Sequence, residues 1–485
     1  MFNAPLVGLL AILLSACSAH YHINTQADSF DKSKGYRFDN LKQENNTDEL
    51  FVCLAFSGGG TRAAAFSYGV LEELKRTTIT INGEKKSLLD EVDCISGISG
   101  GSFTAAYYGA FREKIFDDYR NKFLDQDIQK QLIDSVLYSP RNWFRLMSDK
   151  FDRIDLAAEL YDEDVFVKKT FAAMAEKGRP YIIINATNLE SGTQFSFTGE
   201  YFDALGSKLE DYPLGSAVAA SSAFPYLLSP ISLYNYPKAQ GYEPPWWYED
   251  SLAAQNASRY RYTAGKNIQY YLDEKNHKYI HLMDGGLADN IGVRSLYDEY
   301  SRGFIRKRIN DKSIDKLVFI VVNAKTEPAQ EYSKEESRPG LATVSYKTAT
   351  ISMDNYSYET ITLLAESLKE RLQAQKNLQA CQKLLDKSCP GTKKLPAFGK
   401  NIDPYIVELN FDAIAGIDNE DPNYYLNLPT SFALTKQQVN KLIGIAPKLL
   451  NKSTQYQCLL QVLAAEAQAQ PRPAECDVGS GIFGY

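Results

Sequence analysis

The sequence has 485 residues, enough for one large domain or for up to about three of ordinary size. Its hydrophobic content of 44% and charged content of 23% are ordinary for a globular protein with a sizeable core. The formal net charge of -7, without any long run of basic residues, argues against a nucleic-acid partner. After residue 20, no apolar stretch reaches the roughly 18 residues that would predict a membrane span.

The first 17 residues have the pattern of an export signal. Residues 4–14 form an apolar run that is too short to span a membrane, and small residues follow it. The sequence Leu14-Ser15-Ala16-Cys17 resembles a bacterial lipobox, in which the cysteine is lipidated and becomes the mature N-terminus. No Lys or Arg precedes the apolar run, which leaves an ordinary cleaved signal or a buried hydrophobic helix as alternatives. We expect a lipoprotein anchored through Cys17 in the bacterial cell envelope, at the outer membrane.

The other cysteines agree with an oxidising compartment. Cys53 and Cys94 lie inside apolar, strand-like runs and are expected to be free core thiols. No two cysteines have the spacing of a zinc site and only four histidines exist, so we expect neither a metal nor a cofactor. Cysteines that lie close in sequence are expected to form two local disulfides: Cys381 with Cys389, and Cys458 with Cys476.

The chain alternates short apolar runs with helical patterns. Residues 18–48 are polar with little periodicity, which predicts a tether. Strands that alternate with helices indicate an α/β fold with a mostly parallel central sheet, covered on both faces. Buried strands are predicted at 50–56, 92–96, 181–185, 279–283, 317–322 and 405–409. Helices are predicted at about 61–76 and 101–120, from beyond residue 340 to about 385, and after Thr435.

We expect one main domain at 49–455, with its motif-bearing core at 50–325, and a C-terminal tail at 456–485 that holds a disulfide. Two stretches look like additions to the core. Residues 125–165 are amphipathic and helical, and residues 233–279 are rich in tyrosine. Each of them either packs on the core or forms a wall or lid over a lipid site, because exposed aromatic side chains favour the membrane interface.

Ser99 is the candidate nucleophile. Residues 97–101 match the nucleophile-elbow pattern Gly-x-Ser-x-Gly, with a predicted strand before it and a helix after it. The glycines permit a tight turn that projects the serine at the carboxyl end of the strand, where ligands bind in such sheets. An ordinary glycine-rich turn is the alternative interpretation.

A serine needs a base, and the positions of the histidines decide which kind it has. None of the four histidines lies beyond residue 281, so a Ser-His-Asp triad in the usual chain order is excluded. Asp284 ends a predicted strand, is followed by two glycines, and is the candidate carboxylate base. Asp289 is a weaker alternative that we expect to cap the next helix.

A glycine turn supplies the third requirement, which is stabilisation of negative charge. Gly58, Gly59 and Gly60 lie at a predicted strand-to-helix turn, where backbone amides suit an anion. Arg62 holds either this loop or the developing charge. A nucleotide-binding loop does not fit, because neither glycine-rich nucleotide motif is present in this turn.

In this order, these pieces resemble the patatin-like phospholipase family, whose pattern is Gly-Gly-Gly-x-Arg/Lys-Gly, then Gly-x-Ser-x-Gly, then Asp-Gly-Gly/Ala. Residues 184–189 and 216–225 also look like the family. The resemblance runs from about residue 50 to 325, and less clearly to 450. It implies a three-layer α/β/α sandwich and a metal-free Ser-Asp dyad. The family motifs fall at residues 58–63, 97–101 and 284–286.

The same resemblance implies a role for each matching residue. Ser99 would be acylated, Asp284 would be the base, and the amides of residues 58–60, with Arg62, would form the oxyanion hole. Ser57 replaces an aspartate often found before the glycines, and Ala63 replaces the final glycine. These two departures put substrate preference in doubt more than catalysis.

We therefore expect a lipid acyl hydrolase of the phospholipase A or lysophospholipase type, which acts at a membrane surface through an acyl-enzyme. An esterase or thioesterase for soluble acyl groups is one alternative. A non-catalytic lipoprotein that binds lipid in the pocket is the other.

Overall fold

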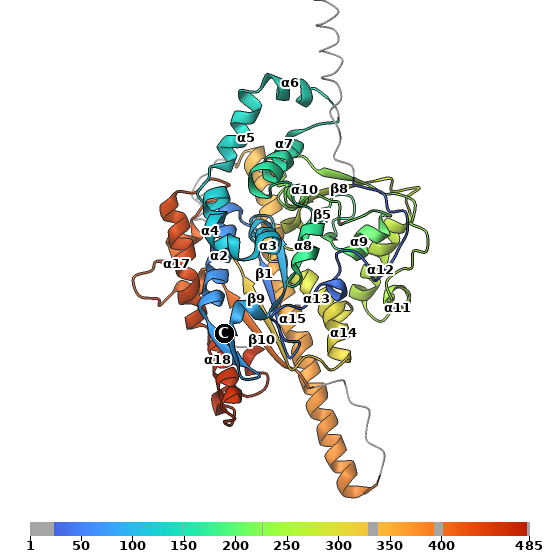
Figure 1. Ribbon diagram of the computed structural model, residues 1–485, viewed down its shortest axis with the longest axis vertical. Coiled ribbons are helices and arrows are strands. Elements are labelled where there is room, and N and C mark those ends of the chain that lie inside the picture. The colour runs from blue at the N-terminus through green and yellow to red at the C-terminus, as the bar shows by residue number, and fades with distance from the viewer. Residues whose placement is uncertain (1–23, 149, 226, 328–337, 392–400, 483–485) are drawn as a thin grey trace, which may run out of the picture.

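The computed structural model describes residues 24–148, 150–225, 227–327, 338–391 and 401–482. A mostly parallel central sheet has helices on both sides (Figure 1), which confirms the predicted three-layer α/β/α architecture. In the part of the chain described here, no helix combines the length and the apolar character needed to cross a membrane.

The main sheet has eight strands in the order β10-β9-β1-β4-β5-β8-β7, with β6 paired to β5. The five strands from β10 to β5 are parallel, whereas β8 pairs antiparallel with both β5 and β7. Its strands are β1 (Leu50–Phe56), β4 (Val92–Ile98), β5 (Tyr181–Asn188), β6 (Gln194–Phe197), β7 (Ile231–Tyr234), β8 (Tyr279–Asp284), β9 (Lys316–Val322) and β10 (Asp403–Leu409). A small hairpin is formed by β2 (Thr78–Ile81) and β3 (Glu84–Ser87).

The parallel strands are almost entirely buried, which explains their continuous apolar sequences. Every residue of β1, β4 and β5 is buried, as expected for strands covered by helices on both faces. All six predicted strands are confirmed, with bounds that differ by a few residues at most.

Helices follow the strands that carry the site. After β1 comes α2 (Gly60–Arg76), and after β4 comes α3 (Gly100–Phe111); the two pack against each other. The C-terminal helix α17 (Lys436–Lys452) packs on α2 and begins at a capping box on Thr435, the predicted start. The other helices are α4 (Ile115–Tyr119), α5 (Ile128–Leu137), α6 (Pro140–Leu146), α7 (Arg153–Leu160), α8 (Phe171–Lys177), α9 (Gly199–Ala204), α10 (Leu214–Ser221), α11 (Tyr248–Ala253), α12 (Arg259–Leu272), α13 (Val293–Ser301), α14 (Phe304–Asn310), α15 (Leu341–Ser388), α16 (Pro422–Leu426) and α18 (Thr454–Ala467).

The expected tether at 18–48 differs from the structure over its described part. Residues 24–48 pack onto the domain instead of standing apart from it. Tyr36 and Phe38 are buried in the core, and the Phe38 ring stacks on Phe304 with centroids 4.1 Å apart. A few well-placed aromatic residues thus outweigh the polar composition that suggested a tether.

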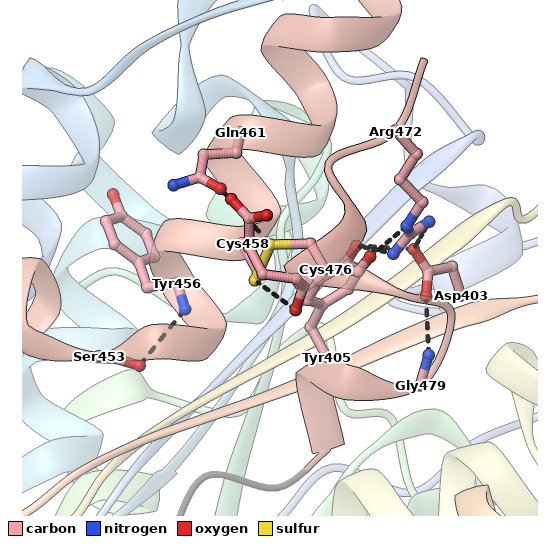
Figure 2. Close-up of a disulfide and its surroundings, with 10 residues drawn as sticks. Asp403, Tyr405, Ser453, Tyr456, Cys458, Gln461, Arg472, Cys476 and Gly479 are labelled. Atoms are coloured by element: carbon pink, nitrogen blue, oxygen red, sulfur yellow. Dashed lines mark hydrogen bonds and ion pairs between the residues drawn. A yellow bond between two sulfur atoms is a disulfide. The ribbon is translucent and has the colours of Figure 1, made fainter.

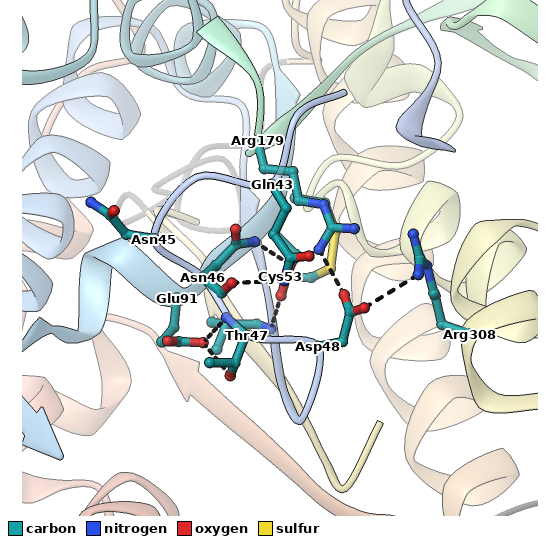
Figure 3. Close-up of polar contacts among 12 residues, drawn as sticks. Gln43, Asn45, Asn46, Thr47, Asp48, Cys53, Glu91, Arg179 and Arg308 are labelled. Carbon is teal, nitrogen blue, oxygen red and sulfur yellow. Dashed lines mark hydrogen bonds and ion pairs between the residues drawn. A yellow bond between two sulfur atoms is a disulfide. The ribbon is translucent and has the colours of Figure 1, made fainter. Parts of the chain in front are cut away.

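Polar contacts also fasten this segment to the amino end of the sheet (Figure 3). The Asn46 side chain donates to the Asp93 carboxylate at 2.5 Å, and the Thr47 amide donates to Glu91 at 2.8 Å. Arg179 lies between Asp48, at 2.9 Å, and Asp93, at 3.0 Å. Burial raises the pKa of Asp93 well above its usual range, and the nearby Arg179 guanidinium opposes that rise.

The disulfides differ in part from the prediction. Cys53 and Cys94 are joined, whereas no disulfide joins Cys381 to Cys389, which are both exposed, so both of these expectations are wrong. Cys53 and Cys94 are joined because β1 and β4 are neighbours in the sheet, and their register places Cys53 opposite Cys94. Cys381 and Cys389 cannot be joined because α15 runs through Cys381 to Ser388, and this stretch of helix separates the two cysteines by about 12 Å.

The predicted disulfide between Cys458 and Cys476 is confirmed, and it joins α18 to the last described segment (Figure 2). Beside it, Arg472 forms an ion pair with Asp403 at 2.7 Å and donates to the Tyr405 hydroxyl at 3.0 Å. The expected C-terminal tail is therefore docked on the start of β10.

The Arg179 contacts generate a test of stability. Arg179→Met should lower the free energy of unfolding by about 1–3 kcal/mol, because it leaves the buried Asp93 carboxyl without the hydrogen bond that Arg179 donates. Urea unfolding of wild type and variant measures this difference. The control is Lys32→Met, which breaks the exposed ion pair with Glu243 and should change stability little. Equal effects of the two substitutions would contradict the role of Arg179.

Candidate active site

Ser99 occupies a strained turn between β4 and α3. Its backbone has φ of 47° and ψ of -119°, in a region that residues other than glycine rarely adopt. This conformation is the one expected of a nucleophile elbow. The turn needs Gly100 because a Cβ there would lie 2.0 Å from the carbonyl oxygen of Gly60. The elbow is therefore packed directly against the glycine turn.

Ser221 holds the backbone of the nucleophile in place. The Ser99 amide donates to the Ser221 hydroxyl at 2.9 Å, and that hydroxyl donates to the carbonyl of Asn185 at 2.6 Å. This link joins the elbow to the end of α10 and to β5. The sequence placed Ser221 in a family-like stretch, at 216–225, but gave it no role.

Asp284 comes close to Ser99 through the pairing of β5. Ile98, just before the nucleophile, pairs with Asn185, and Asp284 pairs with the next residue, Ala186. Asp284 lies at the same edge of the sheet as the elbow, although β8 is antiparallel to β5 rather than parallel to it. The position thus follows from register and not from the common direction of parallel strands.

Two further hydrogen bonds support the backbone of Asp284. Its amide donates to the Ala223 carbonyl at 3.0 Å, and its carbonyl accepts from the Thr187 hydroxyl at 2.8 Å. Ala223 belongs to the same family-like stretch as Ser221. That stretch therefore supports both candidate residues at once.

The Asp284 carboxylate is buried, and its environment suits a base. Burial raises the pKa of Asp284 to about 6, while hydrogen bonds from the Gly286 amide, at 2.8 Å, and from the Ser99 hydroxyl oppose the rise. The carboxylate is therefore ionised at neutral pH yet more basic than an exposed aspartate. The Ser99 hydroxyl lies close enough to lower this pKa, so the carboxylate is near the group whose proton it would accept.

The histidines near β8 are occupied elsewhere. His277 stacks on Tyr270, and His281 is exposed and pairs with the Ser232 hydroxyl at 2.7 Å. Neither of them lines the cavity described below. His20 and His22 lie outside the described residues.

The glycine turn contributes fewer amides than the sequence suggested. The Gly58 amide donates to the Asn290 carbonyl at 2.8 Å and is thus already occupied. Within the described part of the chain, the amides of Gly59 and Gly60 have no acceptor, and both residues line the cavity at the start of α2. The Ser57 hydroxyl, where the family often has aspartate, accepts from the Ala324 amide at 2.8 Å and braces the turn against the end of β9.

Arg62 ties the start of α2 to two neighbouring loops, and its contacts described here do not include the glycine turn that it was expected to hold. Its buried guanidinium donates to two backbone carbonyls, at 2.9 Å each, and to a threonine hydroxyl at 3.0 Å. These acceptors belong to the loops after β9 and α16: Ala324, Leu428 and Thr430.

Asn290 is a site residue that the sequence did not reveal. Its side-chain oxygen lies 2.4 Å from where a Cβ on Gly58 would be, and 2.7 Å from where one on Gly286 would be. It therefore fills the space between the glycine turn and the loop of Asp284. The neighbouring Asp289 is buried and accepts from the Arg294 amide, in the first turn of α13, at 2.7 Å, although the N-cap residue of this helix is Gly292 and not Asp289.

These groups open into one cavity of about 480 Å³. Ser99, Asp284, Asn290 and the glycine turn lie at its polar end. Helices α5 and α7, from the predicted addition at 125–165, form part of its wall, whereas the second addition, at 233–279, is absent from the described lining. The apolar lining residues are Leu132, Ile133, Val136, Leu137, Leu156, Phe224, Leu227, Leu228, Met353 and Phe432. A long apolar space beside a nucleophile suits an acyl chain.

A family model described as patatin-like phospholipase matches residues 54–297, half of the chain. No curated protein matches it. Among solved structures, human GIVD cytosolic phospholipase A2 is similar, at 16% identity and a TM-score of 0.33, over 56% of this chain and 45% of that chain. Its complex with methyl gamma-linolenyl fluorophosphonate is similar at 21% identity and a TM-score of 0.27, over 36% of this chain and 29% of that one. This chain thus covers less than half of either human chain. By the match over half of its length, the chain belongs to the patatin-like phospholipase family.

Proposed function

We propose that the protein hydrolyses acyl ester bonds of phospholipids or lysophospholipids, with Ser99 as nucleophile and Asp284 as its base. The observation that carries this proposal is the meeting of a strained serine and a buried carboxylate in one apolar cavity. Family membership supports the reaction class, and the geometry supports the assignment of the two residues.

The reaction proceeds in two halves. The Ser99 oxygen attacks the ester carbonyl carbon while Asp284 takes the hydroxyl proton, which forms a tetrahedral intermediate. The amides of Gly59 and Gly60 donate to its oxyanion, at the start of α2. The C–O bond to the leaving alcohol then breaks, the alcohol takes the proton from Asp284, and an acyl-enzyme remains. Water attacks the acyl-enzyme with Asp284 again as base, and releases the fatty acid and free Ser99.

We also propose that the protein is exported and lipid-anchored through Cys17 in the bacterial envelope, at the outer membrane. Cys17 lies outside the described residues, so the support is the sequence of the first 17 residues together with two disulfides typical of an oxidising compartment. An anchor would keep the cavity close to its insoluble substrate. Mass spectrometry of the mature N-terminus tests this, since a free N-terminus at any other residue would contradict it.

The nucleophile can be tested by covalent labelling. A fluorophosphonate probe should label the wild type at Ser99, and Ser99→Ala should abolish labelling and the release of fatty acid from phospholipid vesicles. Asp284→Asn keeps the shape of the base but removes its charge, and should reduce both by roughly a thousandfold or more. Equal labelling of Ser99→Ala and wild type would contradict the assignment of Ser99 as the nucleophile. Labelling without vesicle hydrolysis, but with turnover of short soluble esters, would favour the esterase alternative. An unlabelled wild type would favour the lipid-binding alternative.

The raised pKa of Asp284 predicts the pH dependence of the reaction. The base must be ionised, so kcat/KM for a soluble ester should fall about tenfold per pH unit below about pH 6 and level off above it. A pH-rate profile, with circular dichroism at each pH to confirm folding, measures this limb. A profile that stays flat down to pH 4.5 would show that Asp284 is not the base whose ionisation limits the rate.

The contact between Asn290 and Gly58 predicts a sensitive position. Gly58→Ala should lower kcat by roughly tenfold to a hundredfold, because its Cβ would displace Asn290 and with it the glycine turn. Adding Asn290→Gly to that variant should restore part of the rate. The matched control is Gly444→Ala on α17, where a Cβ meets nothing within 4 Å and activity should be unchanged. A normal kcat in Gly58→Ala would contradict the need for this fit.

A further inference from the structure

Helix α5 is both a wall of the cavity and part of the outer surface. Leu132 and Val136 line the cavity together with Ile133 and Leu137, and the last two are also about half exposed. An acyl chain in the cavity would thus lie one side chain away from the surroundings of the protein.

The exposed apolar surface continues beyond α5 into α6. Six large apolar side chains within residues 133–147 are between 48% and 83% exposed, and α6 buries none of its residues. Exposed apolar residues are ordinary when scattered singly, but a contiguous group marks an interaction site. Figure 1 shows α5 and α6 at one end of the long axis of the molecule, away from most of the sheet. The six residues are Ile133, Leu137, Tyr138, Trp143, Phe144 and Met147.

Two other segments at the cavity also expose apolar side chains. Leu227 lines the cavity and is 67% exposed. On α15, Ile351 is 54% exposed beside Thr350, which lines the cavity. These two residues and the six on α5 and α6 are called the rim below.

Trp143 shows how the rim is arranged for contact. Its indole nitrogen donates to the carbonyl of Val136 at 2.5 Å, so its polar group is satisfied within the helical hairpin. The half-exposed ring can therefore enter an apolar medium without losing a hydrogen bond.

Most of the charged side chains that line the cavity are basic. Arg153, Lys325 and Lys347 line the cavity, and Asp284 is the one carboxylate among its described lining residues. Lys325 also pairs with Glu327 at 2.8 Å, near the surface. Basic side chains beside exposed apolar ones match a surface that combines acyl chains with anionic headgroups.

We propose that the rim docks on a lipid bilayer rich in anionic phospholipids, with the cavity mouth facing the membrane. This rests on the proposed function, because the occupant of the rim must be able to pass an acyl chain into the cavity. A bilayer is such an occupant, and it satisfies the apolar rim and the cations together. A second copy of the chain would satisfy only the rim.

The test uses the full-length protein and vesicles of phosphatidylglycerol or of phosphatidylcholine. Trp143→Ser, Phe144→Ser and Met147→Ser, combined in one variant, should weaken binding to phosphatidylglycerol vesicles by roughly tenfold or more and slow their hydrolysis equally. Turnover of a soluble short-chain ester should stay at the wild-type level. The matched control combines Leu189→Ser, Leu384→Ser and Val478→Ser, which are exposed apolar residues outside the rim, and should behave as wild type. Lys347→Gln should weaken binding to the anionic vesicles more than to phosphatidylcholine.

Binding is also measured in the Ser99→Ala background, which separates docking from catalysis. If that protein binds vesicles and the rim variant does not, docking stands even where hydrolysis fails. Unchanged vesicle binding in the rim variant would overturn the docking proposal and leave the proposed function intact. Light scattering measures the oligomeric state, and fluorescence quenching measures the exposure of Trp143; together they test a contact between two copies. A wild-type dimer that becomes monomeric in the rim variant, with Trp143 shielded before any lipid is added, would overturn it in favour of a contact between copies.

Discussion

The candidate active site depends on how β5 is paired. Two consecutive positions of this strand, Asn185 and Ala186, are paired with the residue before the nucleophile and with Asp284. Hydrogen bonds from Ser221 and Thr187 then secure the two backbones on either side. A slip of β8 by a single position would turn Asp284 to the other face of the sheet and separate the two groups. The proximity of these two candidate residues is therefore a product of strand register more than of the motifs themselves.

Burial makes the Asp284 carboxylate a stronger base. Inside the sheet, burial raises the pKa of Asp284, so its carboxylate is more basic than one in water. The amides of Gly59 and Gly60 face the same cavity and supply the opposite partial charge at the start of α2. The candidate base and the candidate anion site thus line the same cavity as the Ser99 hydroxyl. The proposed mechanism uses this arrangement to activate a serine without a histidine.

Much of this could be predicted from the sequence, because local patterns carry local structure. The runs of buried apolar residues identified the strands, and the glycine motifs identified the turns that carry Ser99 and Asp284. What the sequence could not provide was pairing between distant segments. The disulfide between Cys53 and Cys94 depends on which strands are neighbours. The occupied Gly58 amide likewise depends on a contact with Asn290 that no local pattern encodes.

The polar segment before β1 is a second case in which the sequence pattern did not predict the packing. Its composition resembles that of a linker, yet Tyr36 and Phe38 bury fully in the core and Arg179 links Asp48 to the sheet. Average polarity describes a segment poorly when a few side chains carry its packing energy. In contrast, the cap on α17 and the disulfide at Cys458 were predictable, because their partners lie nearby in sequence.

The bond between Cys53 and Cys94 has a consequence for how the site is built. It closes residues 53–94 into a covalent ring that contains the glycine turn and the whole of α2, and the elbow begins directly beyond it. Closing a loop of this length removes unfolded-state freedom equivalent to about 4 kcal/mol. The strand before the glycine turn is thereby tied to the strand before Ser99. In a reducing medium that tie is lost, and the alignment of the two depends on strand pairing alone.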